Sequence, residues 1–228
     1  MFKWLPGLER RRRRLLRNAP PGPLADYLRT PFPSRKSPVN EVEFLAVDLE
    51  TTGLDPKQDE ILSIGCVPIR HLRITLGGSS SMLLKPEGAI PASSAVVHRI
   101  FDDQAAQGMP LTQAIPLLLR QLSGKVLVAH HAPIETEFLR QACRRLYACD
   151  VVFPTVDTLV LERRWIDRRQ VTLASGGLRL AAIRDRYGLP RYPVHNALSD
   201  ALATAELLLA QIAYRGGARQ VRLKHLLI

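Results

Sequence analysis

The sequence predicts an α/β fold in which helices flank a mixed, five-stranded β-sheet. From Glu43 onward, short apolar runs alternate with longer segments in which apolar residues recur at helical spacing. This alternation is typical of a layered domain in which helices pack on a sheet. Hydrophobic residues make up 46% of the 228-residue chain and charged residues 23%, a composition typical of a globular protein with one core.

Five apolar runs have the length and the flanking turn residues of buried strands. The expected strands are Phe44–Val47, Ile61–Ile69, Ser80–Leu84, Val126–Ala129 and Val151–Val156. Between the first two, the segment Thr51–Pro56 has the composition of a turn.

Five segments with helical periodicity lie between or after these strands. They are Pro110–Leu122, Pro133 to Arg145 or Tyr147, Asp157–Trp165, Leu178–Tyr187 and Ser199–Tyr214. Pro133 suits the first turn of its helix, because the N–H that proline lacks would have no partner there. Gly188 is a typical stop residue for the fourth helix, and Gly216 and Gly217 follow the fifth.

Residues 1–40 differ from the remainder and are expected to form a basic, proline-rich N-terminal extension. They contain ten Lys and Arg against two acidic residues, so they carry +8 of the net charge of +11. The run Arg10–Arg14 precedes six prolines that interrupt periodic structure. Two interpretations stay open: a partly helical tail that packs loosely on the core, or an arm that binds polyanions or a partner protein. The main domain is expected over residues 41–215, with a C-terminal tail at 216–228.

The sequence also predicts a compartment. No run approaches the ~18 apolar residues of a membrane helix, and Arg10–Arg14 interrupts the position of a secretory apolar region. We therefore expect a cytoplasmic protein without a membrane span. Cys66, Cys143 and Cys149 match neither a CxxC metal pattern nor a disulfide framework, so buried and unreactive thiols are expected.

Asp48 and Glu50 form the first candidate site, at the end of the first expected strand. Side chains alternate along a strand, so both carboxylates point to one face and Leu49 to the other. Two adjacent acids resist joint ionisation unless a cation lies between them, and Mg²⁺, which prefers oxygen ligands, is such a cation. Acidic pairs are also common on solvated strands. The position of this pair, after an apolar run and before the Thr51–Pro56 turn, favours a metal site.

Further candidate residues lie where helices begin. Glu135 is expected in the first turn of the helix that starts at Pro133, where the helix dipole favours an anion. Asp200 lies near the start of the last helix, and His195 precedes it by five residues. Taken alone, each of these three residues is better explained by an ordinary role at a helix terminus or in a loop.

Taken together, the three segments resemble the motifs of the DEDD-type 3′-5′ exonucleases of the histidine subclass. This family contains the proofreading epsilon subunit of bacterial DNA polymerase III. The matching segments are Val47–Leu54, Ala129–Leu139 and His195–Asp200, in the family's order. The resemblance extends from about Phe44 to Tyr214 and implies a ribonuclease H-like fold.

The resemblance implies a metal-dependent enzyme that releases nucleoside monophosphates from nucleic-acid 3′ ends, with single-stranded DNA favoured as substrate. It implies that two divalent cations, Mg²⁺ or Mn²⁺, bind to Asp48, Glu50, Glu135 and Asp200. His195 would act as general base, because the unperturbed pKa of histidine, ~6.5, suits it to accept a proton near neutral pH. The terminal nucleotide would be held by Thr51, Thr52, Gly53, Leu54, His98 and Ile100. A polymerase or repair complex is the implied partner.

The chain departs from the family pattern twice in the second motif. Glu135 stands where the family usually has Asp, and His131 where it usually has Asn. Glu135 reaches farther by one methylene group, and Glu137 is a rival ligand that is expected to point to a different side of the helix. Asp157 is expected either to start its helix or to contact the site indirectly.

Two alternative functions stay open. The first is an exoribonuclease or oligonucleotide-degrading enzyme of the same fold, since discrimination between RNA and DNA depends on contacts to the 2′-hydroxyl that the sequence does not reveal. The second is an inactive, nuclease-like binding module attached to a polymerase or repair complex.

Overall fold

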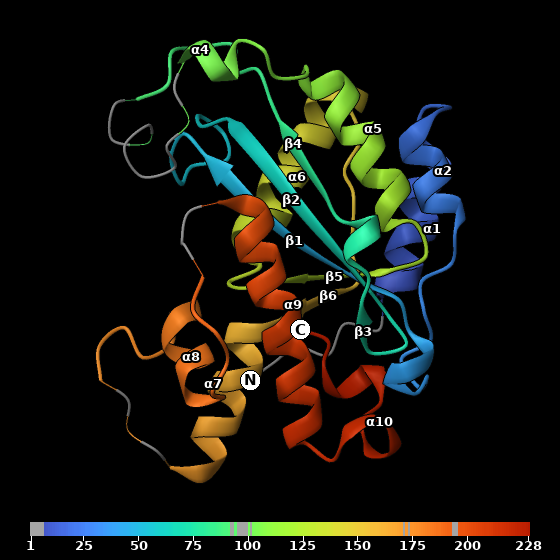
Figure 1. The fold of residues 1–228 in the computed structure, drawn as a ribbon. Coiled ribbons are helices and arrows are strands. Elements are labelled where there is room, and N and C mark those ends of the chain that lie inside the picture. Colours follow the sequence, from blue (N-terminus) through green and yellow to red (C-terminus); the bar gives the residue numbers. More distant parts are fainter. Residues whose placement is uncertain are drawn as a thin grey trace.

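A central β-sheet with helices on both faces forms the fold in Figure 1. The computed structural model describes residues 7–91, 94, 100, 102–170, 172, 174–192 and 196–228. Its strands are β1 (Phe44–Thr51), β2 (Ile61–Arg70), β3 (Arg73–Ile74), β4 (Ser80–Leu83), β5 (Val126–Ala129) and β6 (Thr155–Asp157). Its α-helices are α1 (Leu8–Asn18), α2 (Pro23–Arg29), α4 (Asp102–Ala105), α5 (Leu111–Leu122), α6 (Pro133–Tyr147), α7 (Thr158–Arg169), α8 (Leu180–Arg186), α9 (Ala197–Tyr214) and α10 (Gly217–Gln220). Short 3₁₀ helices are η1 (Val39–Glu41), η2 (Leu76–Gly78) and η3 (Leu223–His225).

Within the described residues the sheet has six strands, in the order β3-β2-β1-β5-β6, with β4 also paired to β2. It is mixed, as predicted, because β1 runs antiparallel to β2 and parallel to β5. The expected count of five strands is one too low, since the two-residue β3 is too short to produce a sequence pattern. The last strand begins at Thr155 instead of Val151, and Pro154 before it has no N–H to donate to a neighbouring strand.

The five helices predicted from periodicity are all present, as α5 to α9. Their limits differ by a few residues from the prediction. α9 begins at Ala197, two residues earlier than expected, because the side chain of Asn196 accepts a hydrogen bond from the Ser199 N–H at 3.1 Å and caps the helix. Among the described helices, none is long and apolar enough to cross a membrane.

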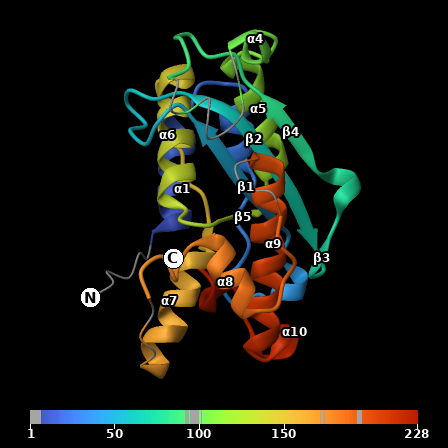
Figure 2. The same cartoon turned by 60° about the vertical axis from the view of Figure 1, so that its left-hand side comes forward.

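Each face of the sheet has its own hydrophobic core. Leu45 and Val47 of β1 pack with helices α1, α2, α5 and α6 on one face. Ala46 packs with α7 and α9 on the other, and Figure 2 shows α6 and α9 on opposite sides of the sheet. Asp48 and Glu50 follow Ala46 at every second position of β1, and alternate residues of a strand point to the same face. Their side chains therefore lie on the face that α9 covers.

The N-terminal helices belong to the core, which argues against the first of the two interpretations of this segment, a loosely packed tail. Leu24 of α2 is fully buried, and the hydroxyl of buried Tyr27 donates a hydrogen bond to the Val152 carbonyl at 3.0 Å. Arg12, from the middle of the arginine run, is also buried, and its guanidinium donates a hydrogen bond to the Leu28 carbonyl. The prolines between these helices shape connections instead of marking a separate tail.

The C-terminal residues 216–228 also pack against the domain. Leu223 and Leu226 are fully buried in the core on the α9 face. The Leu223 N–H donates a hydrogen bond to the Ser37 carbonyl at 3.0 Å, which joins the C-terminal segment to the segment that precedes η1 and β1. The three cysteines are free and buried, as expected.

Candidate active site

Three carboxylates converge near the C-terminal end of β1. Asp48 and Glu50 come from β1, and Asp200 comes from the first turn of α9. One carboxylate oxygen of each residue lies within 4.8 Å of the other two. The alternation along β1 accounts for the first pair, as predicted from sequence. The approach of α9 to the sheet adds Asp200.

Gly65 of β2 permits that approach. It pairs with Asp48 across the antiparallel ladder. A Cβ atom at this position would lie 2.1 Å from the carbonyl carbon and oxygen of Ala197, the first residue of α9. Glycine is therefore required for α9 to start so close to the sheet. Gly65 was not among the residues predicted from sequence, although a glycine inside an apolar strand marks a close backbone approach.

Glu135 is the fourth carboxylate, in the first turn of α6 as predicted. It is 3% exposed, and its Oε2 atom has no hydrogen-bond partner among the described residues. Burial raises the pKa of Glu135 to about 8, with a further contribution from the charge of Asp157. The extra reach of glutamate does not bring Glu135 into the set of three that share the 4.8 Å spacing.

The four acids form one electrostatic cluster. Burial raises the pKa of Asp48 well above its usual range, and the charges of Glu135, Glu50 and Asp200 raise it further. In the part of the chain that the structure describes, no Lys or Arg forms an ion pair with Asp48 or Glu135. Buried like charges are unfavourable unless a cation neutralises them. Several carboxylate oxygens and an unsatisfied Glu135 Oε2 suit hard divalent cations such as Mg²⁺.

Asp157 anchors the segment that carries Glu135. Its carboxylate accepts hydrogen bonds from the backbone N–H groups of His131 and Ala132, at 3.1 and 3.0 Å. It also accepts one from the Leu159 N–H at 2.9 Å and so caps α7. Both roles considered for Asp157 are thus present in one residue. His131 has a φ of 70°, the left-handed conformation that asparagine adopts more easily than histidine.

Side-chain hydrogen bonds of Thr51 and Thr52 stabilise the turn after β1. The Thr51 hydroxyl donates a hydrogen bond to the Gly53 carbonyl at 2.6 Å, and the Thr52 hydroxyl donates one to Asp59 at 3.1 Å. A Cβ atom on Gly53 would lie 2.5 Å from the Asp59 carboxylate, so a larger residue there would displace the Asp59 side chain. Leu54 is 78% exposed at the tip of this turn. The turn therefore offers an apolar side chain to solvent close to the end of β1.

Other predicted site residues have separate outcomes. His195 and His98 lie outside the described residues. Ile100 is partly buried and packs against a small apolar cluster. Glu137, the rival ligand, has a side chain that is 46% exposed and forms an ion pair with Arg140 at 2.5 Å. Glu137 thus points away from the carboxylate cluster, as expected.

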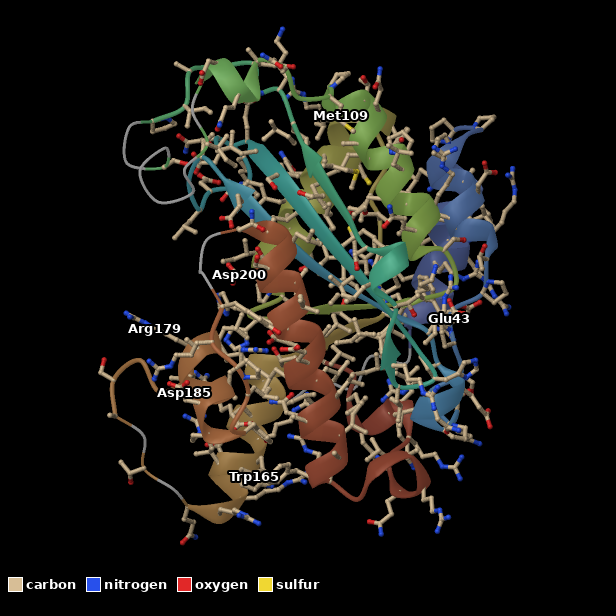
Figure 3. The ribbon with its side chains drawn as sticks, in the orientation of Figure 1. Glu43, Met109, Trp165, Arg179, Asp185 and Asp200 are labelled. Carbon is tan, nitrogen blue, oxygen red and sulfur yellow. The ribbon has the colours of Figure 1, made fainter. Side chains whose placement is uncertain are left out.

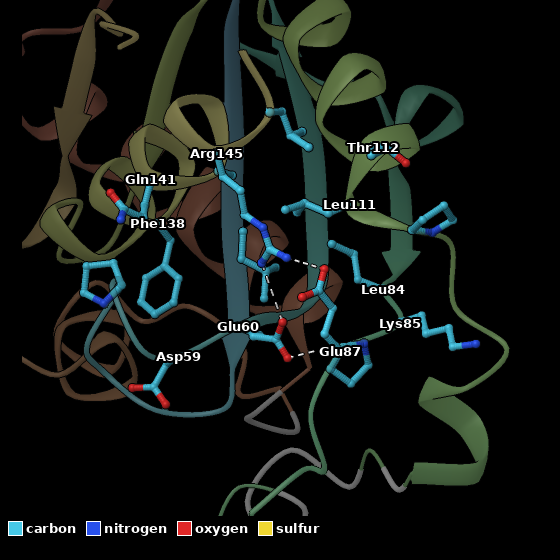
Figure 4. Close-up of a pocket in the computed structure, with 16 residues that line it drawn as sticks. Asp59, Glu60, Leu84, Lys85, Glu87, Leu111, Thr112, Phe138, Gln141 and Arg145 are labelled. Carbon is cyan, nitrogen blue, oxygen red and sulfur yellow. Dashed lines mark hydrogen bonds and ion pairs between the residues drawn. The ribbon is translucent and has the colours of Figure 1, made fainter. Parts of the chain in front are cut away.

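A cavity of about 430 Å³ lies elsewhere, between α5, α6 and the strand ends β2 and β4. Figure 4 shows Arg145 of α6 above this cavity, paired with Glu60 and Glu87. None of the four clustered carboxylates lines it. The cavity is therefore separate from the candidate active site.

Comparison with protein families identifies the domain. Residues 45–208 match the model of the RNase_T family, which is described as exonuclease. The chain belongs to this exonuclease family. The matched segment of the RNase_T domain includes Asp48, Glu50, Glu135 and Asp200, and the resemblance to epsilon-type exonucleases is thereby confirmed.

Several relatives of this RNase_T domain are named as DNA polymerase III proteins or subunits. The domain is 34% identical over 177 residues to the DNA polymerase III subunit epsilon-like protein of Rhodobacter capsulatus, covering 76% of this chain and 24% of that protein. It is 30% identical over 176 residues to the DNA polymerase III subunit epsilon of Treponema pallidum, covering 76% and 78%. It is 31% identical over 176 residues to the PolC-type DNA polymerase III of Thermotoga petrophila, covering 77% and 12%. The match thus spans under a third of the PolC-type and epsilon-like relatives.

Solved structures share the fold of the RNase_T domain. Exonuclease X in complex with 5′ overhanging duplex DNA superposes with a TM-score of 0.58 at 24% identity, covering 80% of this chain and 99% of that one. Exonuclease I superposes with a TM-score of 0.65 at 16% identity, covering 74% and 40%. The predicted ribonuclease H-like fold is thus confirmed.

Proposed function

We propose that this protein is a metal-dependent 3′-5′ exonuclease that releases nucleoside monophosphates, with single-stranded DNA as its favoured substrate. One observation carries the proposal: Asp48, Glu50, Glu135 and Asp200 form an acidic cluster in which Glu50 and Glu135 are buried, and Glu135 Oε2 has no hydrogen-bond partner among the described residues. A fold assembles such a cluster against its own electrostatic repulsion when a bound cation offsets the repulsion.

Asp48, Glu50, Glu135 and Asp200 would hold two divalent cations, Mg²⁺ or Mn²⁺. Bound there, such ions lower the pKa of water and stabilise the charge that develops on the leaving oxygen. Each of the four acids supplies an oxygen ligand of the type that these ions prefer. The burial of Glu135 keeps competing water away from its carboxylate.

The reaction is a hydrolysis at the last phosphodiester bond. A water oxygen forms a bond to phosphorus, and the bond from phosphorus to the 3′ oxygen of the preceding nucleotide breaks. His195 accepts the proton that the water loses, and the leaving 3′ oxygen takes up a proton to become a hydroxyl. The products are a nucleoside 5′-monophosphate and a strand one nucleotide shorter.

The turn formed by Thr51, Thr52, Gly53 and Leu54 would receive the terminal nucleotide, together with His98 and Ile100. The exposure of Leu54 supports this role, because an apolar side chain can lie against the face of a base. DNA is favoured over RNA because relatives are named as DNA polymerase III subunits and Exonuclease X was solved with DNA. The same relatives favour a polymerase or repair complex as partner.

The test uses purified protein with 5′-labelled single-stranded DNA and RNA, in Mg²⁺, Mn²⁺ or EDTA. We expect mononucleotide release that requires metal and that falls about a thousandfold in Asp48→Asn. That loss corresponds to ~4 kcal/mol of transition-state stabilisation by a correctly held metal. His195→Gln should also lower the rate. Glu137→Gln is the matched control, since it neutralises an acid of α6 outside the cluster and should retain activity.

Each outcome separates the candidate functions. Faster cleavage of RNA than of DNA would change the substrate and keep the chemistry. Strand binding without cleavage under any metal condition would contradict the enzyme and support the inactive binding module. Equal loss in Glu137→Gln and Asp48→Asn would contradict the assignment of the metal site.

A further inference from the structure

A second cavity lies beside the acidic cluster, at the C-terminal ends of β5 and β6. It has a volume of about 580 Å³ and is lined by His130 and His131 after β5, by Leu159 of α7, and by the glycine-containing loop 174–180. Ligands of α/β proteins bind outside the carboxyl ends of parallel strands. β1, β5 and β6 are parallel, so this cavity opens at the edge where Asp48 and Glu50 lie.

The sheet order places the cavity across the acidic cluster from the turn Thr51–Leu54. That turn connects β1 to β2, whereas the cavity lies beyond β5 on the other side of β1. The carboxylates of β1 and the first turn of α6 separate the two. Consider a nucleic-acid strand whose terminal nucleotide occupies the turn Thr51–Leu54 and whose scissile phosphate lies at the acidic cluster. The rest of that nucleic-acid strand would continue toward the cavity beside His130.

The cavity contains an exposed cation. Arg179 lies on its wall, and the side chain runs over Gly176, with Nε 3.4 Å from the position a Cβ would take there. Among the described residues Arg179 forms no ion pair, unlike Arg191, which pairs with Asp185 at 2.8 Å. Figure 3 shows Arg179 and Asp200 on the same side of the molecule, with Arg179 reaching outward.

His130 fixes the loop that carries Arg179. Its Nε2 donates a hydrogen bond to the Leu178 carbonyl at 3.0 Å, and its Nδ1 lies 2.8 Å from the Thr158 hydroxyl. Burial lowers the pKa of His130, which favours the neutral ring. The loop is thereby attached to β5 and to α7, so Arg179 is held at a defined place beside the cluster.

We propose that this cavity binds the nucleotide upstream of the scissile bond and that Arg179 pairs with its phosphodiester. The inference rests on the proposed exonuclease function and adds a second substrate contact to it. A guanidinium in this position would balance the repulsion between a polyanionic strand and the acidic cluster, since Arg recognises phosphate through two parallel hydrogen bonds.

Two substrates test the proposal. A single-stranded oligothymidylate has an upstream nucleotide, whereas the p-nitrophenyl ester of thymidine 5′-monophosphate keeps only the terminal nucleotide. In Arg179→Gln, kcat/KM for the oligonucleotide should fall about tenfold relative to kcat/KM for the ester. Arg191→Gln is the matched control and should leave this ratio as in the wild type, because Arg191 does not line the cavity.

Binding supplies a measurement that does not depend on catalysis. Fluorescence anisotropy with labelled oligothymidylate and Ca²⁺ should give a salt dependence of log Kd whose slope is smaller by ~0.7 in Arg179→Gln, the value for one lost contact to single-stranded phosphate. An equal loss on both substrates, or an unchanged salt slope, would overturn the proposal. If the wild type cleaves neither substrate but Arg179→Gln still lowers the slope, the exonuclease function fails and the contact stands.

Discussion

Two groups of buried acids in this protein differ in what surrounds them. Glu162 of α7 is fully buried, and it accepts hydrogen bonds from the Tyr187 hydroxyl at 3.0 Å and from the Gln211 side chain at 3.1 Å. Arg186 also pairs with it at 3.3 Å. Glu135 is almost as deeply buried, yet one of its oxygens has no partner among the described residues.

The difference distinguishes Glu162, an acid with a structural role, from the acids that we propose to bind metal. The contacts of Glu162 join α7, α8 and α9, so its charge is compensated by the fold itself. The charges of Glu135, Glu50 and Asp200 raise the pKa of Asp48, and one Glu135 oxygen has no hydrogen-bond partner among the described residues. Groups that remain electrostatically unsatisfied after folding are characteristic of sites that bind a ligand or a metal. Substitutions at Glu162 and substitutions in the acidic cluster should therefore differ in their effects on stability and on activity.

Gly65→Ala should lower both activity and stability, because it forces the acidic cluster apart. The added Cβ would lie 2.1 Å from the Ala197 backbone, so α9 must move and take Asp200 with it. We expect activity to fall about a hundredfold, as is typical of ~1 Å displacements. Thermal unfolding should show a loss of roughly 1–3 kcal/mol from overpacking. Gly77→Ala is the control, because nothing lies within 4 Å of a Cβ atom at that position. Wild-type activity in Gly65→Ala would contradict the role of Gly65 in positioning α9.

Glu162→Ala should differ from the variants of the acidic cluster: it should lower stability and leave the rate per folded molecule almost unchanged. Removing the acceptor leaves Tyr187, Gln211 and Arg186 without their partner, at a cost of about 1–3 kcal/mol in the free energy of unfolding. Denaturant titration measures this cost, and Asp167→Ala on the exposed side of α7 serves as control. A metal-dependent loss of activity in Glu162→Ala would contradict the division between the two groups.

The pH dependence of stability in the metal-free protein provides a third test. The folded pKa of Glu135, about 8, exceeds its ordinary value of 4.5, so the folded state binds the extra proton between these values. Stability should then fall as pH rises from about 5 to about 8, by an amount on the order of 1–3 kcal/mol. Melting temperatures measured in EDTA test this. Mg²⁺ or Mn²⁺ should recover the stability at pH 8 in the wild type but not in Asp48→Asn, and a pH-independent melting temperature would contradict the prediction.

Glu135→Asp should have the smallest effect. It restores the residue that the related exonucleases usually have, and it keeps the charge while shortening the side chain by one methylene group. We expect activity to change by about tenfold or less, since the ligand type is retained. Glu135→Gln removes the charge and should lower activity much further. Equal activity in these two variants, measured over a range of Mg²⁺ concentrations, would exclude Glu135 as a ligand.

The sequence by itself determined the alternation of strands and helices and the common face of Asp48 and Glu50. These features follow from local periodicity, which depends on a few neighbouring residues. Glu135 and Asp200 could be placed at helix starts for the same reason. The resemblance to exonucleases then joined segments that are far apart in the chain.

Only the tertiary structure decided which of these segments meet and how closely. Leu24 and Tyr27 are core residues although the composition around them suggested a loose tail, because burial depends on contacts with distant elements. The approach of α9 through Gly65 is likewise a contact between strands and helices more than a hundred residues apart. The raised pKa of Asp48 arises only after this packing, since desolvation and repulsion both require the folded chain.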